Sequence, residues 1–294
     1  SGIEQRMYEM GQVLSRVRQV EIGANSNGLV LRTIDETSRA TGSRWGGVRG
    51  YWVDEADSIT DSKPKFGRLE LKLRKVAALG YTTDELLADA AAMTSIYDTA
   101  FTEELTFLVE DGIINGDGAA KPLGIVGHAA TVSVAKETGQ AAATFVYENA
   151  IKMRMRQWGK SRPNAVWFIN QDLEQQLHQM TLNVGTGGVP VYLPAGGVSV
   201  SGYDSLFGKP VIPIEYCATL GTVGDIILAD LSQYLMIRKG GVQQASSMHV
   251  KFTTDEMTFR ATYRCDGQPG WTAPLTPFKG SVTLSPIVTL ATRA

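Results

Sequence analysis

The stretch from Val76 to Ala120 limits the fold more than any other part of the chain, because it contains nine acidic residues and no lysine or arginine. Within it, apolar residues recur mostly every three or four positions, the spacing of one face of an α-helix. They are Tyr97, Phe101, Leu105, Leu108, Val109 and Ile113. The pattern predicts a long helix that ends at Asn115-Gly116-Asp117-Gly118, with one packed face and one face of carboxylates. Thr83, followed by two acids, is a suitable N-cap.

Charge is segregated along the segment from Trp45 to Lys75. Its acids are Asp54, Glu55, Asp57 and Asp61, and its bases are Lys63, Lys65, Arg68, Lys72, Arg74 and Lys75. Apolar residues alternate from Phe66 to Leu73, which is the period of a strand. We therefore expect a long β-hairpin that turns at Asp61-Ser62-Lys63-Pro64. It is either a solvated hairpin or a projection that contacts a neighbouring chain, and segregated charge favours the projection.

The N-terminal segment and the C-terminal half show other residue patterns. Met7, Met10, Leu14 and Val17 predict an amphipathic helix within Ile3–Val20, and an extended arm follows from Gly23 to Trp45. Beyond Ile125 the pattern is mixed α/β, with a Gly- and Pro-rich loop from Gly185 to Gly208. Helices are expected at about Tyr147–Trp158 and Asp172–Met180. Strands are expected at Ala165–Ile169, Pro210–Tyr216, Ile226–Ala229, Tyr234–Arg238, Met248–Thr253, Met257–Cys265 and Val282–Leu290.

Composition excludes several classes of function. A net charge of −2 and a pI near 6.0 provide no chain-wide basic surface for nucleic acid or anionic lipid. No apolar run reaches the roughly 20 residues of a membrane helix, and no signal peptide begins the chain. Cys217 and Cys265 are expected to be two buried thiols in a reducing compartment, with a single disulfide as the alternative.

No motif predicts catalysis, a metal or a cofactor. The three histidines, His128, His178 and His249, are far apart and none has metal-ligand spacing. The segment Gly116–Lys121 resembles a phosphate loop only superficially, because it follows a helix and lacks the Gly-Lys-Ser/Thr ending. We therefore predict no catalytic, cofactor-binding or metal-binding residue, and a protein that is not an enzyme.

A set of segments occurs in an order that is similar to one known family. They are Tyr51-Trp52-Val53-Asp54-Glu55, Lys63-Pro64-Lys65-Phe66, the long helix with Gly116-Asp117-Gly118 and Pro122-Leu123-Gly124-Ile125, Trp167-Phe168-Ile169-Asn170, Leu206–Val211, Ile226–Tyr234 and Phe259–Gly267. Together they resemble the major capsid proteins of tailed bacteriophages, which have the Hong Kong 97-type fold. The segment around Gly116 to Ile125 is the most specific part of the resemblance.

The resemblance implies an α+β fold in four parts. They are an N-terminal arm (1–44), an extended loop formed by the β-hairpin (45–75), a peripheral domain with the long spine helix (76–124 and 239–270) and an axial α/β domain (125–238 and 271–294). Arm and loop are expected to lie mainly on neighbouring subunits. The expected contact residues are Trp52, Asp54, Glu55, Asp57, Lys63, Lys65 and Arg68.

The function implied is that of a major capsid protein that self-assembles into the hexamers and pentamers of an icosahedral phage head. The shell would enclose double-stranded DNA without sequence specificity, in a virion assembled in the host cytoplasm. Implied partners are a portal, a scaffold or a maturation protease, with room for a decoration protein and no membrane. The start at Ser1 without Met suits both proteolytic processing and a residual tag. An encapsulin-like shell around a protein cargo is one alternative, and a soluble α/β enzyme is another.

The resemblance also raises the question of covalent crosslinking. In the type member, a loop lysine forms an isopeptide bond with an asparagine of a neighbouring peripheral domain, helped by a buried glutamate. Lys63 or Lys65 could provide the lysine here, but no asparagine follows Asn183. Asp255 lies in the corresponding segment, and an ionised carboxylate is a poor acyl acceptor because its charge opposes nucleophilic attack. We therefore expect non-covalent shells.

Overall fold

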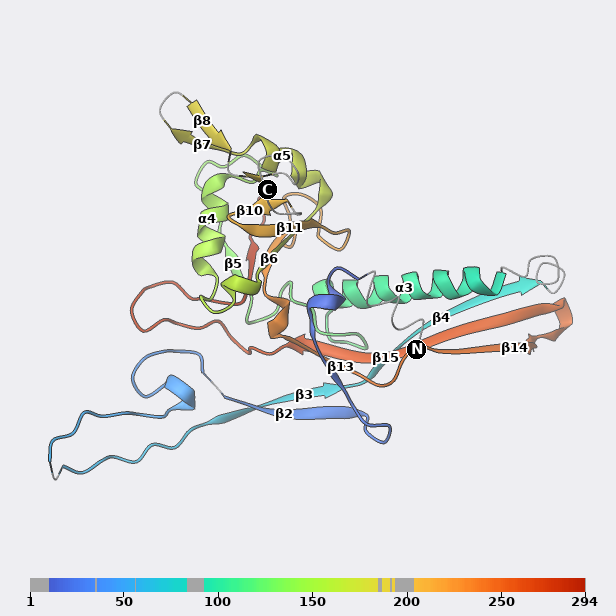
Figure 1. Ribbon diagram of the computed structural model, residues 1–294, viewed down its shortest axis with the longest axis horizontal. Helices are drawn as coiled ribbons and strands as arrows, with labels where there is room; N and C mark the ends of the chain where they lie inside the picture. Colours follow the sequence, from blue (N-terminus) through green and yellow to red (C-terminus); the bar gives the residue numbers. More distant parts are fainter. Residues whose placement is uncertain are drawn as a thin grey trace. The chain divides into compact units, whose positions relative to one another are not determined.

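The computed structural model describes residues 11–34, 36–55, 57–83, 93–184, 187–190, 192–193 and 204–293 (Figure 1). The chain divides into two compact units. The first is built from Ser1–Val30, Glu70–Ile125 and Tyr234–Pro269, and the second from Leu31–Leu69, Val126–Gln233 and Gly270–Ala294. Each unit therefore draws on three separate segments of the sequence.

The first unit is a five-stranded sheet with the long helix α3 (Met93–Asn115) along one face (Figure 1). The central strand, β15 (Glu256–Pro269), pairs along one edge with β4 (Arg74–Thr83). Its other edge pairs with β14 (Gln243–Lys251) and β13 (Tyr234–Arg238). Strand β1 (Arg18–Glu21) lies parallel to β13. Gly80 allows α3 to approach β4 closely, because an added Cβ would lie 2.8 Å from the Tyr97 ring.

The buried face of α3 follows the predicted spacing with one exception. Phe101, Leu105, Val109 and Ile113 are buried, as expected. Leu108 is 41% exposed, so its assignment to the core-facing stripe is wrong. The reason is that adjacent residues of a helix point about 100° apart, and Val109 already occupies the buried direction. The expected N-cap, Thr83, is the last residue of β4, and residues 84–92 after it lie outside the described part.

The Gly-rich segment after α3 folds back tightly on the end of the helix. The N–H of Gly124 donates to the carbonyl of Gly116 over 2.8 Å, and that of Ile125 donates to Ile113 over 3.0 Å. A Cβ at Gly116 would lie 2.0 Å from the Pro122 carbonyl oxygen, so no larger residue fits there. The part of the sequence that carries the most specific resemblance is therefore a turn that requires glycine for steric reasons.

The second unit contains a seven-stranded sheet in the order β5-β16-β12-β6-β11-β10-β9. The strands are β5 (Val132–Val134), β6 (Val166–Ile169), β9 (Tyr192–Leu193), β10 (Ser205–Leu206), β11 (Lys209–Pro213), β12 (Ile226–Ala229) and β16 (Ile287–Leu290). Every residue of β6, β12 and β16 is buried, which explains their continuous apolar sequences. Helix α4 (Tyr147–Arg156) packs on β5 and β16, and α5 (Glu174–Gln179) follows β6. A small sheet pairs β7 (Thr181–Val184) with β8 (Gly187–Pro190).

Some element predictions need correction. The helix expected within Ile3–Val20 is wrong where the structure describes that range: a 3-10 turn, η1 (Leu14–Arg16), precedes strand β1. The Gly- and Pro-rich loop contains β8, β9 and β10, and the last strand is confined to β16. The remaining 3-10 turns are η2 (Arg44–Gly46), η3 (Arg162–Asn164), η4 (Gln171–Leu173), η5 (Leu231–Gln233) and η6 (Phe252–Thr254).

The two cysteines are separate buried thiols, as the sequence favoured. Burial raises the pKa of Cys265 to about 12, and the nearby charge of Asp266 adds to the shift. Burial, with a contribution from Asp225, also raises the pKa of Cys217. Both shifts favour the protonated thiol over the reactive thiolate. Among the described residues, no helix has the length and apolar character needed to cross a membrane.

A buried ion pair fastens the C-terminal residues of the second unit. The Arg293 guanidinium contacts the Asp225 carboxylate, and both side chains are fully buried. The same carboxylate accepts a hydrogen bond from the N–H of Gly221 over 2.9 Å. The Arg293 backbone also donates to the carbonyl of Gly221 and accepts from the N–H of Ala143, each over 2.8 Å. One residue thus joins three segments of the unit.

Replacing Arg293 with methionine should destabilise the unassembled protein by about 3–5 kcal/mol, because the buried Asp225 carboxylate loses its cation. Urea unfolding measures this free energy. The control is Lys121→Met, which removes an exposed pair with Asp117 (Nζ–Oδ2 3.8 Å) and should cost less than about 1 kcal/mol. Equal losses in the two variants would contradict the assigned role of the buried pair.

Candidate assembly surface

The charged segment is an extended loop, but its strand pairing differs from the prediction. Strand β3 (Phe66–Lys72) pairs with β2 (Gly28–Ile34), which lies in the predicted arm. The hairpin expected within 45–75 is therefore wrong, since the described residues from Gly47 to Lys65 form no strand. Glycines at 46, 47 and 50 weaken any strand there, whereas β2 is rich in β-branched residues.

The arm residues that lead into the extended loop are attached to the second unit. Ser38 forms a β-bridge with Thr276, and the Thr276 N–H donates to the carbonyl of Thr37 over 2.9 Å. The Arg44 guanidinium lies 5.7 Å from the centre of the Phe278 ring, a cation–π distance. These contacts hold the end of the arm before Trp45, and the extended loop runs on from there (Figure 1).

A buried carboxylate holds the junction where β3 ends and β4 begins. Asp266 accepts hydrogen bonds from the N–H of Lys72 over 2.7 Å and from that of Gly267 over 2.9 Å. Burial raises the pKa of Asp266, although these two hydrogen bonds and the charge of Arg74 act in the opposite direction. The extended loop is therefore anchored at its return into the first unit by a specific side-chain contact.

All seven predicted contact residues are exposed on this single chain. Six belong to the irregular part of the loop, and Arg68 lies in β3. Apolar side chains accompany them: Trp52 is completely exposed, Ile59 is 74% exposed and Phe66 is 60% exposed. Apolar groups gathered on a charged projection indicate a surface that another molecule covers. The structure brings together Lys63 and Lys65, at a hollow in the loop, but places Asp54, Glu55 and Asp57 elsewhere along it.

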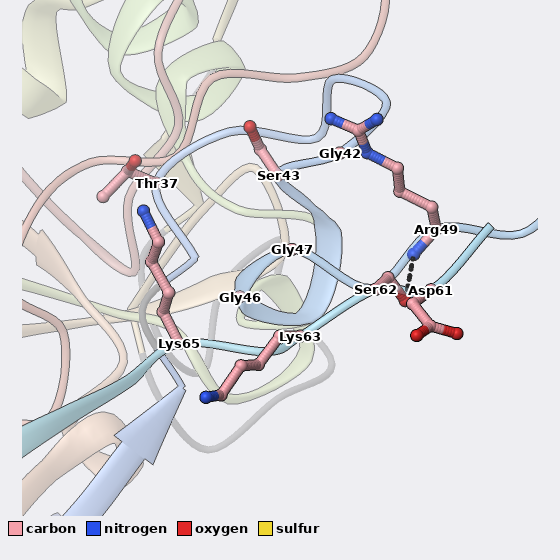
Figure 2. A pocket seen from close by; sticks show the side chains of 10 residues that line it. All are labelled: Thr37, Gly42, Ser43, Gly46, Gly47, Arg49, Asp61, Ser62, Lys63 and Lys65. Carbon is pink, nitrogen blue, oxygen red and sulfur yellow. Dashed lines mark hydrogen bonds between the residues drawn. The ribbon is translucent and has the colours of Figure 1, made fainter.

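That hollow has a volume of about 510 Å³ and lies between the two branches of the loop (Figure 2). Its lining is polar and consists of Thr37, Gly42, Ser43, Gly46, Gly47, Arg49, Asp61, Ser62, Lys63 and Lys65. The branches are joined by the N–H of Lys65, which donates to the Gly46 carbonyl over 2.8 Å, and by that of Arg49, which donates to Ser62 Oγ over 3.2 Å. Three cations and a single carboxylate make the hollow positively charged.

The described part of the N-terminal arm packs on its own unit. Val13, Leu14 and Val17 are buried, and β1 extends the five-stranded sheet. Glu110 Oε1, on α3, accepts hydrogen bonds from the N–H groups of Val13 and Leu14, both over 2.7 Å. The expectation that the arm lies mainly on neighbouring subunits is therefore wrong for residues 11–22.

The role of Glu110 was not predicted from the sequence, because this residue was grouped with the solvated carboxylates of α3. Glu110 is 3% exposed, and Thr102 and Thr106 are buried beside it. These three residues recur every four positions, next to the apolar stripe of α3, so a helical projection of the sequence could have found them. The outward face of the same helix carries Glu103 and Glu104 together with the exposed Phe107 and Leu108.

Within the described residues, no group of three or more potential metal ligands comes together. Burial lowers the pKa of His128, which favours its neutral form. The geometry thus points to contacts between proteins: a charged loop that carries exposed apolar side chains and is firmly anchored at its two ends.

Comparison with known proteins identifies the class. The model of the phage capsid family matches residues 1–280. The capsid of a native GTA particle is 16% identical with a TM-score of 0.72, and the match covers 100% of this chain and 91% of that one. A structure from Mycobacterium phage Adephagia is 14% identical with a TM-score of 0.62, covering 96% and 89%. The capsid of cyanophage P-SCSP1u is 10% identical with a TM-score of 0.53, covering 94% and 85%.

No curated protein matches the sequence significantly. At these identities the solved structures establish the fold, which is the Hong Kong 97-type capsid fold, and the family match covers nearly the whole chain. The chain belongs to the phage capsid family. It is a major capsid protein of the virion, a structural protein that builds a shell by self-assembly. The predicted family and fold are confirmed.

Removal of the Glu110 side chain should loosen the arm. In Glu110→Ala the buried N–H groups of Val13 and Leu14 lose their acceptor, which should cost about 1–3 kcal/mol. Hydrogen exchange at these two amides should accelerate. Glu104→Ala, on the exposed face of the same helix, should leave both amides protected. Unchanged exchange in Glu110→Ala would contradict the anchoring role.

Proposed function

We propose that this chain forms the hexamers and pentamers of an icosahedral head that encloses double-stranded DNA without sequence specificity. The observation that carries the proposal is the match to the phage capsid family over residues 1–280. The extended loop supports it, because apolar side chains of the loop are exposed on the single chain. A near-neutral chain suits a container better than a sequence reader. The same family match favours a phage shell over the encapsulin-like shell and the soluble enzyme.

In this proposal the first unit corresponds to the peripheral domain and the second contributes the axial domain. The ranges proposed from the sequence, 76–124 with 239–270 and 125–238 with 271–294, overlap extensively with the units, whose boundaries lie at Ile125, Tyr234 and Pro269. The extended loop lies on a neighbouring subunit, where burial of Trp52 and Ile59 adds hydrophobic stabilisation. A portal, a scaffold or a maturation protease, and a decoration protein, are further proposed partners.

Negative-stain microscopy of the purified protein tests the shell directly. Closed icosahedral particles are expected, and nuclease-protected DNA inside particles recovered from infected or induced cells separates a phage head from a shell around protein. A population of only one to four chains in light scattering, under conditions that keep the protein folded, would contradict the proposal.

The loop lysines should matter for assembly and not for folding. In the proposal, Lys63 and Lys65 lie near acidic residues of an adjacent subunit, so Lys63→Glu/Lys65→Glu replaces attraction by repulsion. Shell yield should fall at least about tenfold, which corresponds to roughly 1.4 kcal/mol. Circular dichroism of isolated subunits should be unchanged. The matched control is Lys121→Glu/Lys160→Glu, with the same change of charge on exposed lysines outside the loop. Normal shells from the loop variant would count against the contact.

The shells should be held without covalent bonds between subunits. No asparagine follows Asn183, and Asp255 lies in an exposed turn with a left-handed backbone rather than in a dry, organised site. Boiled, denatured particles should therefore run as a single band near the monomer mass of 31.8 kDa. A ladder of covalent oligomers that survives reduction would show that crosslinking occurs.

A further inference from the structure

The extended loop carries two oppositely charged sites at different places along its length. Asp54, Glu55 and Asp57 form an acidic turn, in which the N–H of Asp57 donates to the carbonyl of Asp54 over 3.2 Å. All three acidic residues are exposed, and Trp52 and Val53 precede them. The second site is the basic hollow that Arg49, Lys63 and Lys65 line, with Asp61 as its only acidic lining residue among those described.

The acidic turn of a copy does not form part of the lining of its own hollow. Five residues separate Asp57 from Lys63 along the chain, and they belong to no helix or strand. The structure records no ion pair between described residues of the turn and of the hollow. Figure 1 shows the two described branches of the loop running on beyond the short helix η2. Each copy therefore presents both an acidic and a basic site to its surroundings.

The hollow is built to hold an anionic group. Gly42 has a φ of +88°, and an added Cβ there would lie 2.7 Å from Arg49 Nε, so a side chain would displace the guanidinium. Figure 2 shows Arg49 extending toward Gly42 and Lys65 extending toward Thr37 on opposite sides of the hollow. Gly46 and Gly47 also have positive φ, which lets the backbone curve around the space. The lining offers hydroxyls, backbone and cations, and no large apolar surface.

We propose that the basic hollow of one copy binds the acidic turn of a second copy, head to tail along the shell. The inference rests on the proposed function, because it names the partner of the loop within the assembly. Three carboxylates would meet a hollow lined by three cations and one carboxylate, so most of the charge on both sides would be compensated. A contact between two different surfaces of identical chains repeats from copy to copy and closes into rings when the rotation permits.

Two other occupants fit the observations less well. Glu103 and Glu104 of α3 alternate with Phe107 and Leu108 on a helix face, which presents a ridge and not a narrow turn that could enter the hollow. A free oxyanion would match the charge but would leave Trp52 fully exposed. The acidic turn of a second copy would bring Trp52 and Val53 to the rim of the hollow, where their apolar surface could be covered.

Charge reversal on each side of the contact provides the test. Variant one, Lys63→Glu/Lys65→Glu, makes the hollow acidic, and variant two, Asp54→Lys/Asp57→Lys, makes the turn basic. Each alone should associate at least about tenfold more weakly than the unmodified chain. When mixed, the turn of either variant meets a hollow of opposite charge in the other, so association should return to within about twofold. Sedimentation velocity at low and high salt measures this even in the absence of closed shells.

A third variant controls for the competing occupant. It carries Glu103→Lys/Glu104→Lys and is mixed with variant one in the same way. Recovery in this mixture, and none with variant two, would assign the hollow to α3 and overturn the inference. Failure of variant one to recover in either mixture would also overturn the inference. So would a result in which millimolar phosphate weakens association of the unmodified chain while the charge reversal in variant two has no effect.

The outcomes separate the inference from the function on which it rests. If the unmodified chain forms shells and the two reversed variants fail to recover when mixed, the capsid function stands and the head-to-tail contact does not. If the mixed variants associate and the unmodified chain never closes a shell, the contact stands and the proposed function fails. Circular dichroism of every variant shows that the subunits remain folded.

Discussion

The packing of α3 on β4 and β15 is the interaction on which the first unit depends. Its buried apolar stripe covers the sheet, and the adjacent Glu110 holds the backbone of Val13 and Leu14. The same helix therefore joins the core and the described start of the chain. Its outer face is acidic and exposed. On its buried side the hydroxyls of Thr102 and Thr106 donate to carbonyls one turn earlier in the helix, so both donors are satisfied.

Burial is divided unequally between the units and the loop. The sheets of both units contain strands with every position, or nearly every position, buried, whereas the loop exposes Trp52, Ile59 and Phe66. An isolated chain gains nothing from these exposed groups, since hydrophobic stabilisation depends on removal of apolar surface from water. The two ends of the loop are anchored by contacts with Thr276 and Asp266. Its exposed apolar side chains become buried when another molecule covers them.

The sequence predicted most of what depends on local periodicity. The buried stripe of α3, α4 and the continuous apolar strands β6, β12 and β13 appear close to their expected places. The pairing of β3 with β2 could not be predicted, because more than thirty residues separate the two strands and periodicity contains no information about partners. For the same reason the partners of Glu110 and Arg293 could not be predicted, although a helical projection places Glu110 next to the buried stripe of α3. The candidate contact residues are exposed on the single chain, and their role in assembly stays a prediction. That Lys63 and Lys65 line one hollow is likewise a tertiary feature, which periodicity does not contain.

The division of charge within one loop has a consequence for assembly. Exposed ion pairs are individually weak and are screened by salt, so no single pair holds a shell together. A weak contact that recurs at every subunit lets wrongly placed copies dissociate before a shell closes, and the summed contacts then make the closed shell stable. Oppositely charged sites on the same loop disfavour a contact that brings the same site of two copies together, because like charges would then oppose each other. The proposed contact between the acidic turn of one copy and the basic hollow of the next joins two different surfaces, which is the kind of contact that generates rings when the rotation permits.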